Sequence, residues 1–238
     1  MNGGIDLSFL DNRLTANYDY YVRYTTGMLT TGKTLPNVIG IKEPKENAAD
    51  MKTRGWELSL MWRDQFNLKD SPFNYSVRFV LADSRSFITK FDNYVNITDE
   101  NGNVIGRTSK WDKYYVGQEI GEMWGLTTEG FFQSEEELKN HADQSKVGED
   151  DQSYQFYVGD LKFKDINGDG KIDNGAGTLA DPGDYKKIGN KSNRLPFSVD
   201  LNADWKGFDI RAFFQGIGKK DWYAEGGNHY FWGIYAQP

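Results

Sequence analysis

Apolar and polar residues alternate with a period of two along much of the chain. In LTANYDYYVRYT (14–25), every second residue from Leu14 to Tyr24 is apolar or aromatic, and most of the residues between them are polar. The same alternation recurs in an opening segment around Ile5 and in later segments around residues 56, 75, 197 and 208. Such a pattern is typical of amphipathic β-strands with one apolar and one polar face. We therefore predict antiparallel strands at about residues 4–26, 55–85 and 197–216.

The connections between these segments come in two sizes. LDNR (10–13) and WKGF (205–208) read as tight hairpin turns, and RDQFNLKDSP (63–72) as a moderate one. Two longer polar connections cover about residues 27–54 and 86–196. If the connection at 86–196 contains no full strand or an even number of them, all short turns lie at one end of the predicted strands and all long loops at the other. Outer-membrane barrels have this asymmetry.

Strand length and aromatic placement favour the same class. The strands reach the roughly 9–11 residues that a tilted membrane strand needs, whereas strands of globular proteins average about 5–6. Four aromatic residues are expected at strand ends, where an interface girdle would place them: Tyr24, Trp56, Trp62 and Trp205. The alternation by itself also fits an ordinary antiparallel sheet that covers a core. The difference in loop length between the two ends of the strands favours the barrel.

The composition of the chain favours one fold class and excludes several kinds of partner and site. Aromatic residues make up 15% of the chain, with 26 Gly and only 6 Pro, which favours an all-β fold. A formal charge of -7 argues against a nucleic-acid partner, and the absence of Cys excludes disulfides and thiolate metal sites. Membrane-spanning helices need about 18 apolar residues in a row, and no such run exists. The mean hydropathy of -0.71 still permits barrel strands, which alternate.

The segment DINGDGKID (165–173) matches the Asp-rich pattern of calcium-binding loops. Asp165, Asn167 and Asp169 fill the first three side-chain ligand positions, Lys171 the backbone-carbonyl position and Asp173 the position that often acts through water. Ala176 stands where a bidentate acid is expected, so Asp181 or Asp184 must reach back, or water completes the shell. We predict a structural Ca²⁺ site that ties down a long loop. The alternative is a loop of Asx-turns that needs no ion.

Other candidate chemistry is sparse. A short helix is expected over Ser134–Lys139, with Ser134 as N-cap and Glu137 completing a capping box. The only histidines, His141 and His229, support neither a metal cluster nor a catalytic base, and we expect no enzyme. Aromatic residues of the loops could stack on sugar rings or pack the loops together; these candidate substrate-binding residues are Trp111, Trp124, Tyr154, Trp222, Tyr230 and Trp232.

Five segments in this order resemble the SusC-like family of TonB-dependent outer-membrane transporters. They are GIDLSFLDNRLTANYDYY, NAADMKTRGWELSLMW, VGQEIGEMWGLTTEGFFQSEEEL, VGDLKFKDINGDGKID with a later DYKKIGN, and DLNADWKGFDIRAFFQGIGKKDWY. The resemblance covers nearly the whole chain. It implies that residues 1–238 are part of the C-terminal region of a 22-stranded barrel with long extracellular loops, and that the metal loop spans 165–184, with Asp184 at the position of the family's last acid.

The family also implies partners and a location. Its members import glycans or peptides across the outer membrane of Gram-negative bacteria, together with a SusD-like surface lipoprotein and with energy from TonB. The family's plug domain, TonB-contacting segment and signal peptide find no match here, and the strands are too few to close a barrel. We therefore expect a piece of a longer protein, or one chain of a larger assembly.

The leading hypothesis is a transmembrane barrel segment that faces lipid through Leu14, Leu58, Val77 and Leu201, and faces the lumen through Asp19, Arg78 and Asp200. The alternative from another class is a secreted, calcium-stabilised β-sandwich that binds carbohydrate. A surface adhesin module is a third interpretation. The barrel hypothesis requires that Tyr18, Leu60 and Leu201 do not meet inside a dry core.

Overall fold

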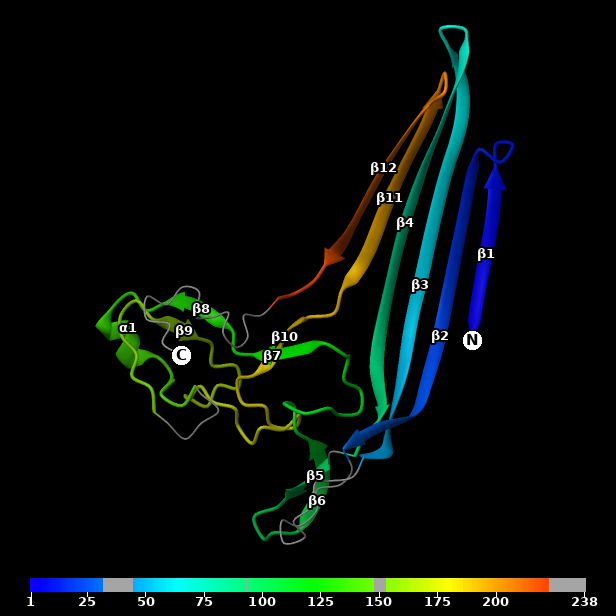
Figure 1. Ribbon diagram of the computed structural model, residues 1–238. Helices are drawn as coiled ribbons and strands as arrows, with labels where there is room; N and C mark the ends of the chain where they lie inside the picture. Colours follow the sequence, from blue (N-terminus) through cyan, green and yellow to red (C-terminus); the bar gives the residue numbers. More distant parts are fainter. Residues whose placement is uncertain (32–44, 93, 148–152, 223–238) are drawn as a thin grey trace. The chain divides into compact units, whose positions relative to one another are not determined.

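A computed structural model of the chain describes residues 1–31, 45–92, 94–147 and 153–222 (Figure 1). The chain divides into two compact units. The sheet unit comprises Met1–Thr25, Met51–Phe87 and Asn190–Pro238, and the loop unit comprises Thr26–Asp50 and Ile88–Gly189. No helix in the described ranges has the length and apolar character required to cross a membrane.

Six long strands form one antiparallel sheet in the order β1-β2-β3-β4-β11-β12. Their bounds are β1 Asn2–Phe9, β2 Leu14–Thr31, β3 Lys45–Leu68, β4 Ser71–Lys90, β11 Arg194–Trp205 and β12 Phe208–Lys219. β11 pairs directly with β4, although the whole loop region separates them in sequence. The loop region is therefore an insertion between two adjacent strands of a continuous up-and-down sheet.

Three tight turns connect successive strands at one end of this sheet (Figure 1). Lys69 and Asp70 have φ of 49° and 58°, and Lys206 and Gly207 have φ of 50° and 83°. Positive φ at both central residues is what a type I′ hairpin requires, and its twist suits antiparallel strands. The segment expected to form a moderate connection at 63–72 is thus a two-residue turn, because β3 runs to Leu68 and β4 begins at Ser71.

Strands β2, β3 and β4 extend beyond the bounds that the alternation marks. β3 begins at Lys45 rather than near residue 55, and its first half, KENAADMKTRG, consists of polar or small residues apart from Met51. Backbone hydrogen bonds to neighbouring strands need no apolar face, so an alternation of apolar and polar residues does not mark this half. The expectation that Tyr24, Trp56 and Trp62 lie at strand ends is wrong as a result, whereas Trp205 does end β11. Trp56 lies near the middle of the 24-residue β3 and stacks on Tyr18 at 6.4 Å.

Apart from the ends of β2, β3 and β4, the loop unit contains only short elements. They are β5 Tyr94–Thr98, β6 Val104–Ser109, β7 Glu122–Gly125, β8 Thr128–Phe131, α1 Glu135–Asn140, β9 Leu161–Phe163 and β10 Lys186–Asn190. The short strands pair as β5–β6, β7–β10 and β8–β9. The buried hydrophobic side chains of the described chain all belong to this unit: Ala49, Ile88, Trp111, Tyr115, Phe132 and Ile172.

The short helix forms close to the predicted position, with one difference at its cap. Ser134 has extended backbone angles and its Oγ accepts a hydrogen bond from the Glu137 backbone N–H at 3.1 Å. The Glu137 carboxylate accepts from the N–H of Gln133 at 2.7 Å, one residue before the position that a standard capping box uses. Both bonds satisfy backbone donors that the first helical turn leaves free.

Candidate functional site

The apolar residues of the six-stranded sheet share one face. Ile5 lies opposite Tyr18, Val77 lies opposite Leu201, and Leu201 in turn lies opposite Ala212. Side chains directly opposite each other on adjacent strands lie on the same side of the sheet. The register therefore builds one apolar surface across the sheet unit, as the alternation predicts.

This apolar surface is not a core. Tyr18 is 43% exposed and Leu201 is 38% exposed, and Leu60 is half-buried. Ile210 on β12 is 71% exposed. Apolar patches of such extent on a protein surface are typical of contact with another protein or a membrane. The requirement that these residues stay outside a dry core is met.

The opposite face of the sheet is polar and hydrogen-bonded across strands. Asp200 lies opposite Arg78 and accepts two bonds from the Arg211 guanidinium, at 3.0 and 2.6 Å. Asp19 lies opposite Gly4, where the absence of a Cβ leaves room for the Asp19 carboxylate. The residues predicted to face lipid and those predicted to face the lumen thus fall on opposite sides wherever the register is known.

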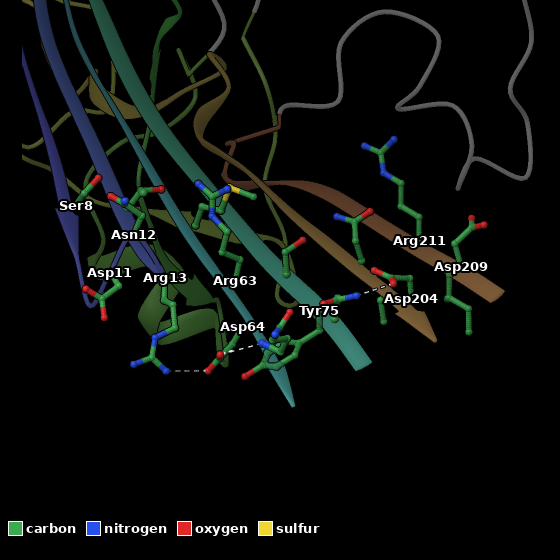
Figure 2. A pocket seen from close by; sticks show the side chains of 18 residues that line it. Ser8, Asp11, Asn12, Arg13, Arg63, Asp64, Tyr75, Asp204, Asp209 and Arg211 are labelled. Carbon is green, nitrogen blue, oxygen red and sulfur yellow. Dashed lines mark hydrogen bonds and ion pairs between the residues drawn. The ribbon is translucent and has the colours of Figure 1, made fainter. Parts of the chain in front are cut away.

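Near the tight turns, the polar face forms a concave surface (Figure 2). The Arg13 guanidinium lies 3.3 Å from the Asp64 carboxylate, and the Asn74 amide donates to Asp204 at 2.8 Å. The lining side chains come from all six strands of the sheet or from the turns between them. A surface of this kind suits water or a polar segment rather than hydrocarbon.

The Asp-rich loop is organised by its own backbone. The two carboxylate oxygens of Asp165 accept from the N–H groups of Gly168 and Gly170 at 2.6 and 2.9 Å. Asn167 accepts from the N–H of Asp169, and Asp169 accepts from that of Lys171 at 2.8 Å. Each of these bonds closes a small ring within the loop. This is the pattern of Asx-turns.

Asp184 reaches back to this loop across its longer second half. Its carboxylate is fully buried and accepts from the backbone N–H groups of Ile166 at 2.6 Å and Asp173 at 3.0 Å. Asp181, the other candidate, instead accepts from the N–H of Ala176 at 3.0 Å. Ile172 is fully buried and anchors the loop, with its N–H donating to the Asp143 carbonyl at 2.8 Å.

The carboxylates of the loop do not converge on one point. In the part of the chain that the structure describes, no group of three or more His, Cys, Asp or Glu side chains is arranged to hold a metal ion. The donor set itself is chemically suited to a hard cation, because it consists of carboxylate and amide oxygens. The calcium assignment therefore stays a prediction.

The candidate substrate-binding aromatics are dispersed. Trp111 is buried, and its ring lies between those of Trp124 at 5.7 Å and Tyr185 at 4.7 Å. Tyr154 is 41% exposed, and Trp222, which belongs to the sheet unit, is 70% exposed. Tyr230 and Trp232 lie outside the described residues. Trp111 and Trp124 thus hold loops together in this structure, while Trp222 is available to a ligand.

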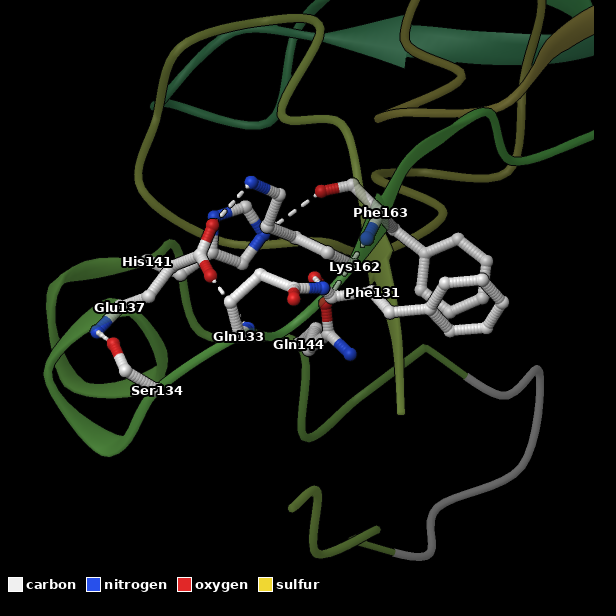
Figure 3. Close-up of polar contacts among 8 residues, drawn as sticks. All are labelled: Phe131, Gln133, Ser134, Glu137, His141, Gln144, Lys162 and Phe163. Carbon is white, nitrogen blue, oxygen red and sulfur yellow. Dashed lines mark hydrogen bonds and ion pairs between the residues drawn. The ribbon is translucent and has the colours of Figure 1, made fainter. Parts of the chain in front are cut away.

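A polar cluster between α1 and the β8–β9 hairpin has no counterpart in the sequence reasoning (Figure 3). The Lys162 ammonium contacts the Glu137 carboxylate at 2.6 Å, and His141 Nε2 lies 2.8 Å from the Phe163 carbonyl oxygen. The Lys162 hydrogen bond holds the pKa of Glu137 below its usual range, and the same contact raises the pKa of Lys162. Only the acidic start of the helix gave a sequence signal for this contact.

The sequence of this chain is similar to those of known TonB-dependent receptors. The TonB-dependent receptor P3 of Formosa agariphila is 25% identical to the chain over 214 residues, which is 89% of this chain and 19% of the relative. The TonB-dependent receptor P26 of the same organism is 25% identical over 95% of this chain and 21% of the relative. This chain is related to the TonB-dependent receptors. It spans about a fifth of the length of the relatives it matches.

Solved structures agree with this relationship at the level of the fold. The RagAB peptide transporter matches 90% of this chain and 20% of its own with a TM-score of 0.56 and 21% identity. The RagAB peptide importer in its open-open state matches 91% and 20% with a TM-score of 0.54 and 22% identity. No protein-family model matches the chain.

The predicted resemblance to TonB-dependent receptors and the predicted antiparallel all-β fold are therefore confirmed. The described strands form part of a barrel wall and do not close a barrel. The named relatives are receptors and importers, in agreement with the expectation of a protein without a catalytic site.

Proposed function

We propose that this chain is a wall segment and loop region of an outer-membrane transporter that imports oligosaccharides or peptides. The apolar face of the sheet would contact lipid, and the polar face would line the interior. In this proposal the full-length protein works with a SusD-like surface lipoprotein and draws energy through TonB. TonB-dependent receptor relatives and the likeness to a peptide importer support the transport role.

The continuous apolar surface of the sheet unit carries the proposal. Val77 and Leu201, directly opposite each other, are 37% and 38% exposed, and the other sheets of the described chain have only two strands each. A bilayer spans about 30 Å of hydrocarbon and has no water to satisfy backbone groups, so only helices and closed barrels cross it. The strands are long enough, since β11 and β12 have 12 residues each.

The alternative β-sandwich needs a different arrangement. In a sandwich, the apolar faces of two sheets interdigitate and become buried. The exposure of Ile5 at 60% and Phe208 at 75% favours the membrane instead. Calcium-dependent binding of glycans by a detergent-free monomer is what the sandwich predicts.

Transport is tested with the full-length protein in its native outer membrane. Cells that carry it should accumulate labelled oligosaccharides or labelled peptides, and loss of TonB should abolish the uptake. A membrane fraction that contains the protein in a heat-modifiable form, which is typical of folded barrels, should accompany this activity. Recovery of the protein in the medium, with no TonB-dependent uptake of either cargo, contradicts the proposal.

We further propose that Ca²⁺ binds the loop formed by Asp165, Asn167, Asp169, Lys171, Asp173 and Asp184. The residues fit the ion by donor type, and carboxylate oxygens that already accept one N–H keep a second lone pair for a cation. The fully buried Asp184 carboxylate supports a site that the chain closes around. Calcium would stabilise the loop unit rather than take part in any reaction.

Removal of calcium from the full-length protein with a chelator should increase hydrogen exchange in residues 161–185 and leave the sheet unit unaffected. Asp169→Asn should weaken the response to added Ca²⁺. The matched control is Asp99→Asn, because Asp99 accepts N–H bonds in an ordinary hairpin turn outside the loop. Equal exchange with and without chelator in the wild type would leave the Asx-turn interpretation standing instead.

A further inference from the structure

The loop unit contains three Asn-Gly pairs, at residues 101–102, 167–168 and 174–175. Asparagine followed by glycine is the pair most prone to spontaneous loss of ammonia, because glycine has no Cβ to hinder its own backbone nitrogen. Asn167 and Gly168 are both exposed, so water reaches the reacting atoms. The fate of such a pair therefore depends on what holds the N–H of its glycine.

Deamidation at Asn167 needs a free nitrogen on Gly168. In this reaction the Gly168 nitrogen bonds to the Asn167 side-chain carbon Cγ, the Cγ–Nδ2 bond breaks, and the N–H proton leaves with Nδ2 as ammonia. The succinimide ring that forms then takes up a water molecule and opens to aspartate or to isoaspartate. An N–H that donates to a strong acceptor is withheld from this attack.

Two of the glycine N–H groups donate to carboxylates. The Gly168 N–H donates to the Asp165 carboxylate at 2.6 Å. The Gly175 N–H donates to the Asp173 carboxylate at 2.7 Å. A hydrogen bond to a charged acceptor is stronger than one to a neutral oxygen. The nearby negative charge also disfavours the charge that the nitrogen acquires when its proton leaves.

Asp165 holds the nitrogen of a second reactive pair as well. Asp169 and Gly170 form the only Asp-Gly pair of the chain, and the other carboxylate oxygen of Asp165 accepts from the Gly170 N–H at 2.9 Å. At this pair the Asp169 carboxyl group loses water to form the same kind of ring and regains it when the ring opens. One carboxylate thus withholds the nitrogens of both pairs.

Reaction at either residue would disrupt the loop. Asn167 accepts from the Asp169 N–H at 3.0 Å, and Asp169 accepts from the Lys171 N–H at 2.8 Å. Isoaspartate adds a carbon atom to the main chain and shortens the side chain, so it displaces these acceptors. Ring opening at Asn167 also replaces a neutral amide with another carboxylate. The loop therefore keeps its form only while these residues stay unmodified.

We propose that Asn167 is a latent deamidation site and that Asp165 keeps it closed by holding the Gly168 N–H. The product is an isoaspartyl peptide bond, formed without an enzyme and with water as the only co-reactant. Asp173 protects the pair at 174–175 in the same way. This role of Asp165 depends neither on transport nor on a bound ion, since the hydrogen bonds lie within the chain.

The test uses the full-length protein in detergent, aged at mildly alkaline pH with a chelator, so that only the chain itself gives protection. Peptide mass spectrometry follows deamidation at Asn167 and Asn174, and the synthetic peptide LKFKDINGDGKID gives the unprotected rate. The wild type should react well below that rate. Asp165→Ala should raise the rate at Asn167 about tenfold or more, because a hydrogen bond to a charged group suppresses the free N–H by about that factor. Asp165→Asn should raise it less, since an amide oxygen still accepts an N–H.

Asp173→Ala is the reciprocal variant. It should raise the rate at Asn174 and leave the rate at Asn167 unchanged, whereas Asp165→Ala should do the opposite. A similar rise at both asparagines in either variant would show general loosening of the loop and overturn the inference. A rate at Asn167 that Asp165→Ala leaves unchanged, or a wild type as fast as the peptide, would overturn it as well.

The pair at 101–102 is an internal control in every sample. The Gly102 N–H donates to the backbone carbonyl of Asp99 at 3.0 Å, a bond that none of these variants changes. Its rate should therefore equal that of the wild type throughout. Unchanged hydrogen exchange in the sheet unit shows that each variant is folded. Failure of the transport or calcium proposal leaves these rates as predicted, so the two kinds of failure are distinguishable.

Discussion

The sheet unit and the loop unit place their apolar side chains in opposite ways. In the loop unit, residues such as Phe132, Ile172 and Trp111 are buried against neighbouring loops, as in any protein that folds in water. In the sheet unit, Ile5, Leu201 and Ile210 form an ordered surface that remains exposed. The two units therefore differ in what surrounds their apolar residues. Those of the loop unit pack against each other, whereas those of the sheet remain open, as the proposed contact with hydrocarbon requires.

The carboxylates of the two units also differ in their hydrogen-bond partners. Carboxylates on the sheet bond across strands to Arg and Asn side chains, as Asp200 does with Arg211. Carboxylates in the loop unit mainly accept backbone N–H groups, as Asp165 and Asp184 do. Irregular backbone cannot satisfy itself through a ladder, so side chains take over that role. The loop unit depends on single residues more strongly as a consequence.

The largest expected effect concerns the core of the loop unit. Phe132→Ala should destabilise this unit by about 3–5 kcal/mol, the usual cost of truncating a buried phenylalanine. Phe131→Ala, at the neighbouring exposed position, should change its stability by less than about 1 kcal/mol. Hydrogen exchange of peptides from residues 88–147 in the full-length protein measures both. Equal effects at the two positions would show that the loop unit has no core of its own.

A smaller effect is expected at Asp184. Asp184→Ala removes the acceptor for the N–H groups of Ile166 and Asp173 and should cost about 2–3 kcal/mol, because buried donors would lose a charged partner. Asp181→Ala removes acceptors at a less buried position and should cost less. Exchange of the amides in 165–175 is the measurement. A greater loss for Asp181 than for Asp184 would reverse the roles assigned to them.

The smallest effect is a pH dependence at α1. The pKa of Glu137 is lowered in the folded protein by the Lys162 hydrogen bond, so its contribution is present above the ordinary glutamate pKa and disappears as pH falls through the lowered value. Protection of the α1 amides should therefore fall in acid, below about pH 4.3. Glu137→Gln should remove this dependence, while Glu136→Gln on the exposed side of the helix should retain it. The same acid profile in both variants would exclude Glu137 as its source.

Sequence reasoning was most successful where one physical rule acted alone. Alternation identified the faces of β1, β2, β11 and β12, because successive side chains of a strand point to opposite faces and each face has its own environment. It did not detect the first half of β3, where Met51 is the only large apolar residue, nor the Lys69–Asp70 turn, because β3 reaches it through the mostly polar residues 63–68. These elements are fixed by pairing with neighbouring strands, which a local pattern does not contain.

Some residues of the candidate site could be predicted from the sequence, and others depend on contacts between distant segments. The Asp-rich loop was visible because its ligand types recur at fixed spacing, but the choice of Asp184 over Asp181 depends on how an 11-residue separation from Asp173 folds back. The burial of Trp111 between Trp124 and Tyr185 depends on three distant segments. The exposure of Phe131 and the burial of Phe132 were not predictable from the sequence, since they depend on the position of α1 and His141.

The central claim is that one face of the sheet contacts hydrocarbon and the other does not. Leu201→Arg and Asn202→Arg, at neighbouring positions of β11 on opposite faces, test it in the full-length protein. An arginine that faces the middle of a bilayer costs about 2–4 kcal/mol, whereas one that faces a lumen costs little. Reversible unfolding of the two variants in lipid vesicles should show a loss of this size for Leu201→Arg and a negligible one for Asn202→Arg. Equal losses, or a larger loss for Asn202→Arg, would contradict the account.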